Sequence, residues 1–452
     1  MPNELGPRGL SRTRAYGAYE VMVEHRILHS SDWHLGVSTG TVSRLQEQRL
    51  FFEWLRDTLT AEQIDTLVVA GDIFDTMQPS AEAQNVYYRF LARVGETGIR
   101  QVVIVGGNHD SPTRLDASGP ILGALSVHVV GGYTDPGRMV IPLYSRGSDE
   151  VTAVCLAVPY MHEYRLGVRT TLMDTSDAKK QFKDAFGGLY RELVDTAEKD
   201  YPGVPVIATG HLTLGSKVDK DDYPQEIHQV GTIDAMSTDI IDPRIAYTAL
   251  GHIHRSFPVQ KDRGIWYSGT PVPYSLKESE SQRVVLSVTV GAELDVKALP
   301  VPLRRTLVEI RGTRDVVVER LRTLQWEEDL PPLVHVFIET DHVEVSLTHS
   351  LHEALSEHPE LARPALVEVK QGRSAEAIEA ALSETQSFDL GKLTTTEVFQ
   401  LLCQSEGKSE EATERLTQSF ELIRLADDAA LQALIPESKR VSANTTEAEV
   451  SA

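Results

Sequence analysis

Residues Gln101–Asp110 read QVVIVGGNHD and combine an apolar strand with a polar turn. The first half is an unbroken run of aliphatic side chains, which is typical of a strand buried on both faces of a parallel sheet. The glycine pair that follows allows a sharp turn and lets another group approach the backbone closely. Asn108, His109 and Asp110 then stand together at the end of the strand. An amide, an imidazole and a carboxylate in this position predict a functional site.

Four other apolar runs end in the same way. Two precede this stretch, RILHSSDWHLG from Arg26 and TLVVAGDIFD from Thr66, and two follow it, VPVIATGH from Val204 and AYTALGHIH from Ala246. Amphipathic segments lie between the first three runs, at Ser43–Gln63 and Ser80–Val94. Strands that alternate with helices predict a parallel sheet, and ligands of such sheets bind at the carboxyl ends of the strands. The polar groups are therefore expected at one edge of the sheet.

The strand ends carry a set of side chains suited to a metal ion. These are the hard oxygen and imidazole ligands Asp32, His34, Asp72, Asn108, His211, His252 and His254. The set contains no thiolate, which favours Mn²⁺, Fe²⁺ or Zn²⁺. Seven ligands are too many for one such ion with open positions, but they suit two ions if a carboxylate bridges them, and Asp72 is the expected bridge. Two ions ~3.5–4 Å apart can activate a water and hold a phosphoryl group for in-line displacement.

Each motif alone is weaker evidence than the whole order. A single Asp-x-His is most often a surface turn, and Asn-His-Asp alone can be an Asn or Asp turn. The order of all five motifs, each after an apolar strand, predicts a dinuclear site. We expect His109 to face the substrate, where it stabilises developing charge or protonates the leaving oxygen. Asp110 is expected to orient its neighbours, and Trp33 and Phe74 to pack beneath the site.

Composition limits the functional classes. The 452 residues are enough for about three domains of ~150 residues. The net charge of −22 argues against unaided, nonspecific binding of nucleic acid. The two cysteines, Cys155 and Cys403, lie far apart, which suits a reducing cytoplasm. The sequence contains no apolar run of membrane-spanning length, and no secretory signal or GxxxxGK[ST] phosphate loop is recognisable. We therefore expect a cytoplasmic protein that does not hydrolyse ATP by that route.

These motifs resemble those of the calcineurin-like metallophosphoesterases. More narrowly, the chain resembles the SbcD nuclease subunits of bacterial SbcCD complexes, through RILHSSDWHLG, GDIFD, VGGNHDSPTRL, GHIH and YSGTPVPYSLKES. The resemblance implies a four-layer αββα β-sandwich, followed by a small α+β capping domain and C-terminal helices. It also implies that Asp32, His34, Asp72 and His254 hold one metal and Asp72, Asn108, His211 and His252 the other, usually manganese. His109 matches the catalytic histidine, and Asp75 stands where some archaeal relatives carry a second one.

The resemblance implies partners as well. The expected function is the nuclease subunit of an ATP-dependent complex that processes DNA ends and hairpins in repair, recombination and replication. It would act as a 3′–5′ double-strand exonuclease and a single-strand endonuclease. DNA binding would be shared with the coiled-coil ATPase SbcC in a heterotetramer with two copies of each subunit, near the nucleoid. Two alternatives remain: a phosphoesterase for small phosphoesters or cyclic nucleotides, and a scaffold subunit with an idle metal site.

The expected domain organisation follows the chain. Residues 1–24 are expected to be a disordered extension, with Met22 as a candidate start. The nuclease domain covers 25–300 and the capping domain 301–372, with a boundary near 295–303, where Leu299–Pro302 is typical of a linker. Helices within 387–433 present apolar faces and are expected to bind the partner, and 434–452 form a disordered tail.

Overall fold

The computed structural model describes residues 24–166, 175–215, 236–340, 347–372, 396, 399–400, 403 and 409–425. The chain divides into two compact units. The larger unit consists of Met1–Ile338 and Val345–Lys370, and the smaller unit consists of Glu339–Glu344 and Gln371–Ala452. Among the described residues, no helix is long and apolar enough to cross a membrane.

A six-stranded sheet forms the first half of the larger unit, in the order β14-β13-β1-β4-β5-β6. Its parallel strands are β1 (His25–Ser30), β4 (Thr66–Ala70), β5 (Gln101–Val105) and β6 (Val127–Val130). Helices α1 (Leu45–Ala61) and α2 (Ala81–Val94) are the crossovers between the first three strands. Ser80 caps α2, because its Oγ accepts a hydrogen bond from the Ala83 amide at 3.1 Å. The predicted strand–helix–strand series is confirmed.

A second six-stranded sheet has the order β11-β12-β10-β9-β8-β7. Its strands are β7 (Val140–Tyr144), β8 (Val151–Leu156), β9 (Val206–His211), β10 (Ile245–Gly251), β11 (Phe257–Gln260) and β12 (Ile265–Tyr267). The four central strands β8, β9, β10 and β12 are parallel. The long helix α6 (Thr175–Asp200) precedes β9. The two metal-type motifs of the second half, at His211 and His252, therefore also end parallel strands.

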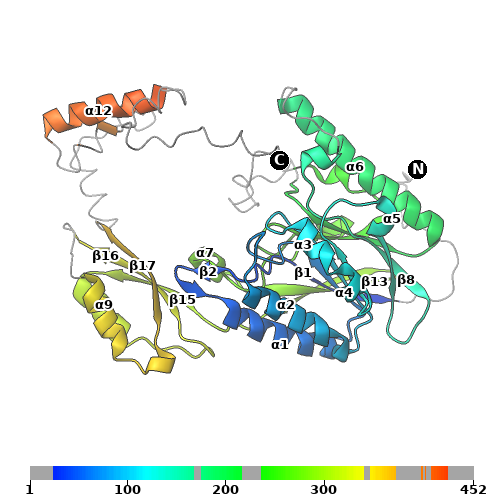
Figure 1. Cartoon of the computed structure of the whole chain (residues 1–452), viewed down its shortest axis with the longest axis horizontal. Coiled ribbons are helices and arrows are strands. Elements are labelled where there is room, and N and C mark those ends of the chain that lie inside the picture. Colours follow the sequence, from blue (N-terminus) through cyan, green and yellow to red (C-terminus); the bar gives the residue numbers. More distant parts are fainter. Residues whose placement is uncertain are drawn as a thin grey trace, which may run out of the picture. The chain divides into compact units, whose positions relative to one another are not determined.

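Two apolar cores explain the layers. One core joins alternate residues of the first sheet, such as Val68, to the second sheet and to α6. The other joins the opposite residues, such as Leu67 and Val69, to α1 and α2. Because side chains alternate across a strand, β4 contributes to both cores, and each buried valine adds ~1.5–3 kcal/mol. Figure 1 shows α1 and α2 on one side of the two sheets and α6 on the other.

Short elements complete the larger unit. They are the hairpin β2 (Ser38–Thr39) with β3 (Val42–Ser43), and the helices α3 (Pro112–Ala117), α4 (Gly119–Gly123), α5 (Pro136–Met139) and α7 (Leu276–Ser279). Single 3₁₀ turns lie at Gly95–Thr97, Glu163–Leu166, Thr238–Ile240, Lys261–Arg263 and Glu360–Ala362. Trp33 packs edge-on against Phe52 with ring centroids 4.9 Å apart, and Phe74 is buried. Both have the packing role that the sequence predicted.

The stretch Leu299–Pro302, expected to be a linker, begins inside a strand, because β14 ends only at Pro300; Val301 and Pro302 follow the strand. Two antiparallel strands, β13 (Val284–Val290) and β14 (Leu294–Pro300), pair along their whole length. The Val301 amide then donates to the Arg283 carbonyl at 2.9 Å. Pro300 can belong to this strand because β14 lies at the edge of the sheet, where the missing N–H of a proline breaks no ladder.

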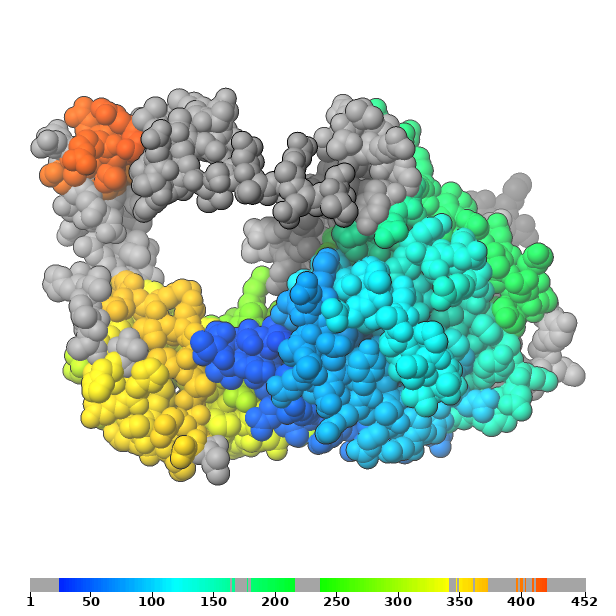
Figure 2. All heavy atoms as spheres, viewed as in Figure 1, coloured from blue at the N-terminus to red at the C-terminus, as the bar shows by residue number. Residues whose placement is uncertain are grey.

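A separate three-stranded sheet, in the order β15-β16-β17, follows. Its elements are β15 (Leu307–Gly312), α8 (Arg314–Arg322), β16 (Leu333–Glu339), α9 (Leu347–Ser356) and β17 (Ala365–Gly372), which agree with the predicted α+β pattern. The hairpin β2–β3 touches this sheet, since a Cβ on Gly40 would lie 2.7 Å from the Val367 carbonyl oxygen. Figure 2 shows the dark blue hairpin region meeting the yellow segment that contains β17.

The smaller unit contains the helix α12 (Glu410–Leu425), which confirms the helix predicted there. Phe399 stacks on Phe420 of this helix with ring centroids 4.3 Å apart. Most of the remainder of the segment 387–433, in which helices were predicted, lies outside the described residues, as do the predicted disordered segments apart from residue 24.

Candidate metal centre

The loops after β1 and β4 run side by side beyond the sheet. The Asp32 amide donates to the Gly71 carbonyl at 3.0 Å, and the His34 amide donates to the Asp72 carbonyl at 3.0 Å. The parallel pairing of the two strands thus continues into the loops. This backbone ladder places the side chains of the Asp-x-His motif next to that of Asp72.

Backbone strain is concentrated at the same place. Asp32, His34, Asp72 and His252 have φ values of 52°, 42°, 50° and 94°. Left-handed conformations of this kind cost ~1–3 kcal/mol each in residues other than glycine. Four of the seven predicted ligands are held in this way, which indicates that their orientation is imposed by the surrounding structure.

Two glycines make room for the side chains of the site. A Cβ on Gly107 would collide with the carboxylate of Asp72, and a Cβ on Gly71 would collide with the imidazole of His211. Gly71 also has φ +92°, which glycine adopts without strain. Of the glycine pair in the opening motif, Gly107 is therefore needed for the close approach of the Asp72 carboxylate, and Gly106 for the close approach of the Gly131 backbone.

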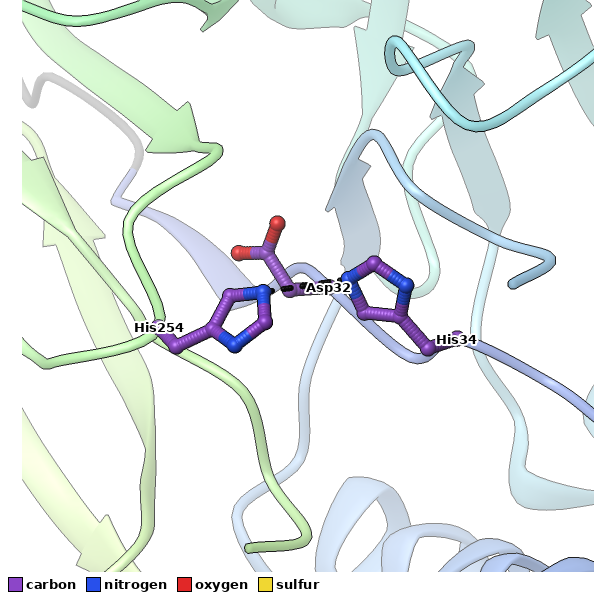
Figure 3. A group of neighbouring side chains, drawn as sticks. All are labelled: Asp32, His34 and His254. Atoms are coloured by element: carbon purple, nitrogen blue, oxygen red, sulfur yellow. Dashed lines mark hydrogen bonds between the residues drawn. The ribbon is translucent and has the colours of Figure 1, made fainter. Parts of the chain in front are cut away.

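The first group of ligand atoms is made by Asp32, His34 and His254. The Nε2 atoms of His34 and His254 lie 3.1 Å apart. One ligand atom from each of the three residues fits within a mutual separation of 4.8 Å. Figure 3 shows the two imidazole rings directed toward one another, with the Asp32 carboxylate beside them. Asp72 Oδ2 lies 3.6 Å from His34 Nε2, so it borders this group.

The second group is made by Asn108, His211 and His252. Asn108 Oδ1 lies 3.0 Å from His211 Nε2 and 3.0 Å from His252 Nδ1. Asp72 Oδ2 lies 3.3 Å from His211 Nε2. The same carboxylate oxygen therefore borders both groups. All seven sequence-predicted ligands are brought together, and Asp72 stands between the two groups as the bridging hypothesis requires.

Hydrogen bonds fix which imidazole nitrogen faces the centre. His211 Nδ1 donates to the Ala70 carbonyl at 2.8 Å, which leaves Nε2 as the electron-pair donor. His254 Nδ1 lies 2.8 Å from Glu278 Oε1, which orients its Nε2 in the same way. Asp110 accepts hydrogen bonds from the amides of Gly107, Ile73 and Phe74 at 2.9, 3.0 and 2.9 Å. The Asp110 carboxylate thus joins the two loops beneath the centre.

The charges of the centre are strongly coupled. Burial by itself would raise the pKa of Asp72, but the neighbouring His211 and His34 hold it below its usual value. Burial opposes protonation of His211, yet the Asp72 carboxylate raises the pKa of His211 to about 9. Burial, together with the charge of His211, lowers the pKa of His252 to about 3. A buried anionic carboxylate among imidazoles is an environment that suits a divalent cation.

His109 lies at the exposed edge of the centre. Its ring meets the His34 ring edge-on at 4.8 Å between centroids. Its Nδ1 donates to the Asp75 carbonyl at 2.7 Å, so Nε2 is left for a substrate atom. Its amide donates to Asp72 Oδ1 at 2.9 Å. Ring atoms of His34 and His109 and an Asp72 oxygen also fall within 4.8 Å of one another, so metal ligation is the alternative role for His109.

Two residues that support the centre were missed in the sequence. Gln48 Nε2 donates to the carbonyls of Trp33 and His34, each at 2.9 Å, and holds the strained loop from α1. Glu278 contacts His254 and accepts from the Tyr274 amide at 2.6 Å. For Gln48, the available signal was a glutamine on the inner, apolar face of a helix. Glu278 follows no strand end and has no ligand spacing; it lies in the stretch YSGTPVPYSLKES that carries the resemblance, but no metal-supporting role was predicted for it.

Replacing Glu278 with glutamine is expected to weaken metal binding ~10–100-fold, the range found when a carboxylate partner of a metal-bound histidine is lost. Titration with Mn²⁺, followed by calorimetry, measures the change. Glu280→Gln is the matched control, because Glu280 is two residues away and does not contact His254. Equal affinities for the two variants would show that Glu278 does not support the centre.

Comparison with known proteins places the chain in a family. The family model for calcineurin-like phosphoesterases matches residues 25–256. The chain is similar to the SbcD subunit of the SbcCD nuclease of Escherichia coli K12, with 31% identity over 404 residues, covering 87% of this chain and 96% of the relative. The SbcD subunit of Rhodobacter capsulatus is 33% identical over 367 residues, covering 75% of this chain and 89% of the relative. The SbcD subunit of Bacillus subtilis is 34% identical over 258 residues, covering 56% of this chain and 63% of the relative.

Proposed function

Because this chain belongs to the calcineurin-like phosphoesterase family and is a homologue of the SbcD nuclease subunits, we propose that it is a metal-dependent nuclease that hydrolyses DNA phosphodiesters. The observation that carries this proposal is the convergence of two ligand groups on Asp72 Oδ2, at 3.6 Å from His34 and 3.3 Å from His211. We further propose the finer activities expected from the resemblance, a 3′–5′ double-strand exonuclease and a single-strand endonuclease.

The fold supports this proposal. Two packed six-stranded sheets with helices on both outer faces fit a four-layer αββα metallophosphoesterase sandwich. We propose that residues 25–300 form this nuclease domain. The sheet β15-β16-β17 with α8 and α9 has its own apolar core, and we propose it as the capping domain, residues 301–372.

The donor set fits two divalent metal ions. Asp32, His34, His254 and Asp72 would hold one ion, and Asp72, Asn108, His211 and His252 the other. Nitrogen and oxygen donors without thiolate fit Mn²⁺, which we propose as the metal. The two ions, when bound, supply Lewis acidity at the scissile phosphate and lower the pKa of water beside it.

The protein's own groups perform the remaining tasks. Asp72 and Asp32 bring negative charge to the centre, and the fixed histidine tautomers leave their lone pairs directed inward. His109, held by the Asp75 carbonyl, presents Nε2 at the exposed edge. In the imidazolium form this atom can donate a hydrogen bond to a non-bridging phosphate oxygen or give its proton to the leaving 3′ oxygen. Asp75 thus supports His109 through its backbone.

We propose that the chain acts with a coiled-coil ATPase of the SbcC type, in a heterotetramer with two copies of each subunit that processes DNA ends and hairpins. The relatives are subunits of SbcCD nucleases by name. The net charge of −22 argues against unaided, nonspecific binding to a polyanion, which favours a second subunit that shares DNA binding. The cytoplasmic, nucleoid-associated location stays a prediction from the same resemblance.

Deleting residues 387–452 is expected to abolish binding of the ATPase subunit and to leave Mn²⁺ binding unchanged. The segment contains α12 and the stacked Phe399–Phe420 pair, and it belongs to the unit that lacks the metal centre. Co-purification with the tagged ATPase, together with a Mn²⁺ titration, measures both effects. The assignment of this segment fails if the truncated chain still co-purifies.

A small phosphoester or a cyclic nucleotide is the alternative substrate class. The test is cleavage of end-labelled duplex and hairpin DNA with Mn²⁺, with and without the ATPase and ATP, beside a cyclic nucleotide and bis(p-nitrophenyl) phosphate. The nuclease proposal predicts Mn²⁺-dependent cutting of DNA. Turnover of the small esters with intact DNA would favour the alternative, and DNA binding without any cleavage would favour an idle scaffold.

A further inference from the structure

A cavity of about 350 Å³ lies apart from the seven predicted metal ligands. Its wall is built by the start of α1, the loop Pro271–Pro273, residues 279–283 and the segment 300–305 that leads to β15. The cavity therefore lies where the part of the chain that forms the two six-stranded sheets leads into the three-stranded sheet. Its size falls in the range of small-molecule sites.

The wall contains a buried group of charges that does not balance. Arg44 is 0% exposed, Glu47 2% and Arg305 7%. Glu47 Oε1 lies 2.5 Å from Arg44 Nε and 2.9 Å from Arg305 Nε, so both guanidinium groups share one carboxylate oxygen. Two positive charges against one negative charge leave a buried excess of one positive charge. Such an excess is costly unless a counter-charge is present.

Two N–H donors of this group, Arg44 Nη2 and Arg305 Nε, have no hydrogen-bond partner among the described residues, although Arg305 Nε lies within ion-pair distance of Glu47. Arg44 Nη1 donates to Thr39 Oγ1 at 2.9 Å, but the buried Arg44 Nη2 has no hydrogen-bond partner among the described residues. Arg304 Nε, from another part of the wall, is also buried and unpaired within the described chain, and so is Glu47 Oε2. The only other carboxylate that lines the cavity within the described residues belongs to Glu280.

We propose that this cavity, which we call the arginine pocket, binds a phosphate group. A phosphate oxygen would accept the free N–H of Arg44 and neutralise the buried excess charge. Guanidinium groups match phosphate geometry and remain charged when buried. The cavity volume admits a free phosphate or the phosphate of a mononucleotide. Bound there, the anion would connect α1 of the catalytic sheets to the segment that begins the three-stranded sheet.

The test is thermal unfolding of the full-length, metal-free protein in EDTA. Sodium phosphate is compared with sodium chloride at the same pH and ionic strength, and deoxyadenosine 5′-monophosphate with deoxyadenosine. We expect phosphate to raise Tm by a few degrees at ~100 times its dissociation constant, because a ligand stabilises the state that binds it. A larger effect of the mononucleotide than of phosphate identifies a nucleotide site; equal effects identify a site for free phosphate.

Substitutions of single arginines test whether phosphate stabilises the protein by binding in the arginine pocket. Arg44→Gln and Arg305→Gln should each lose the phosphate-specific rise, and Arg322→Gln should keep it, because Arg322 forms an exposed ion pair with Glu357. Arg305→Gln keeps the test valid if Arg44→Gln does not fold. The proposal is overturned if phosphate stabilises the wild type no more than chloride does. It is also overturned if the rise persists in Arg305→Gln, since binding would then lie elsewhere.

Discussion

Replacing His109 with alanine is expected to reduce DNA cleavage ~10²–10⁴-fold, the range for loss of a general acid or base. Both metal ions should remain bound, because the seven other side chains are the proposed ligands. The physical reason is the position of His109: Nδ1 is held by the Asp75 carbonyl at 2.7 Å, and the side chain is exposed at the edge of the centre. Single-turnover cleavage with the partner present, beside a metal count, measures both effects.

The metal count separates the two roles that the geometry allows for His109. A variant that loses a metal ion along with activity would show that His109 is a ligand, as its proximity to His34 and Asp72 permits. A variant that cleaves at the normal rate would exclude both roles. His352→Ala is the control, because His352 is an exposed histidine of α9, and it should change neither quantity.

Replacing Asp72 with alanine should have a still broader effect. Asp72 Oδ2 borders both ligand groups and Oδ1 accepts the His109 amide at 2.9 Å. Loss of the proposed bridge would remove a ligand from both metal ions, and it would also remove the acceptor of the His109 amide. If this removes ~4 kcal/mol of transition-state stabilisation, cleavage falls on the order of 10³-fold. Metal analysis after gel filtration should show that tight binding of both ions is lost.

Asp57→Ala is the control, since Asp57 is an exposed aspartate of helix α1. It should retain both ions. Equal metal content in the two variants would contradict the bridging role of Asp72.

The metal-free Asp72→Ala protein offers a second, independent signal. In the wild type, the Asp72 carboxylate outweighs burial and raises the pKa of His211 to about 9. Without that carboxylate, burial disfavours the charged imidazole, so the pKa of His211 should fall. Titration of the histidine ring signals by NMR measures the change. An unchanged pKa would show that Asp72 does not control the charge of the centre.

The first sheet could be predicted from the sequence because its parallel strands follow one another with a helix between each pair. In that arrangement the carboxyl ends must meet at one edge, so the ligands after β1, β4 and β5 could be grouped without knowing any long-range contact. The return of β13 to pair with β1 could not be predicted in the same way. That pairing joins His25 to Val290, and an apolar run does not specify a distant partner.

The proposed metal ligands could be predicted from the sequence, but the residues that hold them in place could not. Metal ligands belong to a few residue types in recognisable spacings, whereas a supporting residue needs only one hydrogen-bonding atom in the right place. Gln48 and Glu278 reach the centre from a helix and from a segment after the last ligand. The sequence also did not reveal that β14 continues to Pro300, into the linker predicted at Leu299–Pro302, because a proline at the end of an edge strand looks the same in sequence as a proline in a linker.

The most direct test of the central claim is anomalous diffraction at the manganese edge from crystals of the protein soaked in Mn²⁺. The dinuclear centre bridged by Asp72 predicts two peaks ~3.5–4 Å apart, one beside His34 and His254 and the other beside His211 and His252. A single peak, or a second peak without Asn108 and His252 as its neighbours, would contradict it.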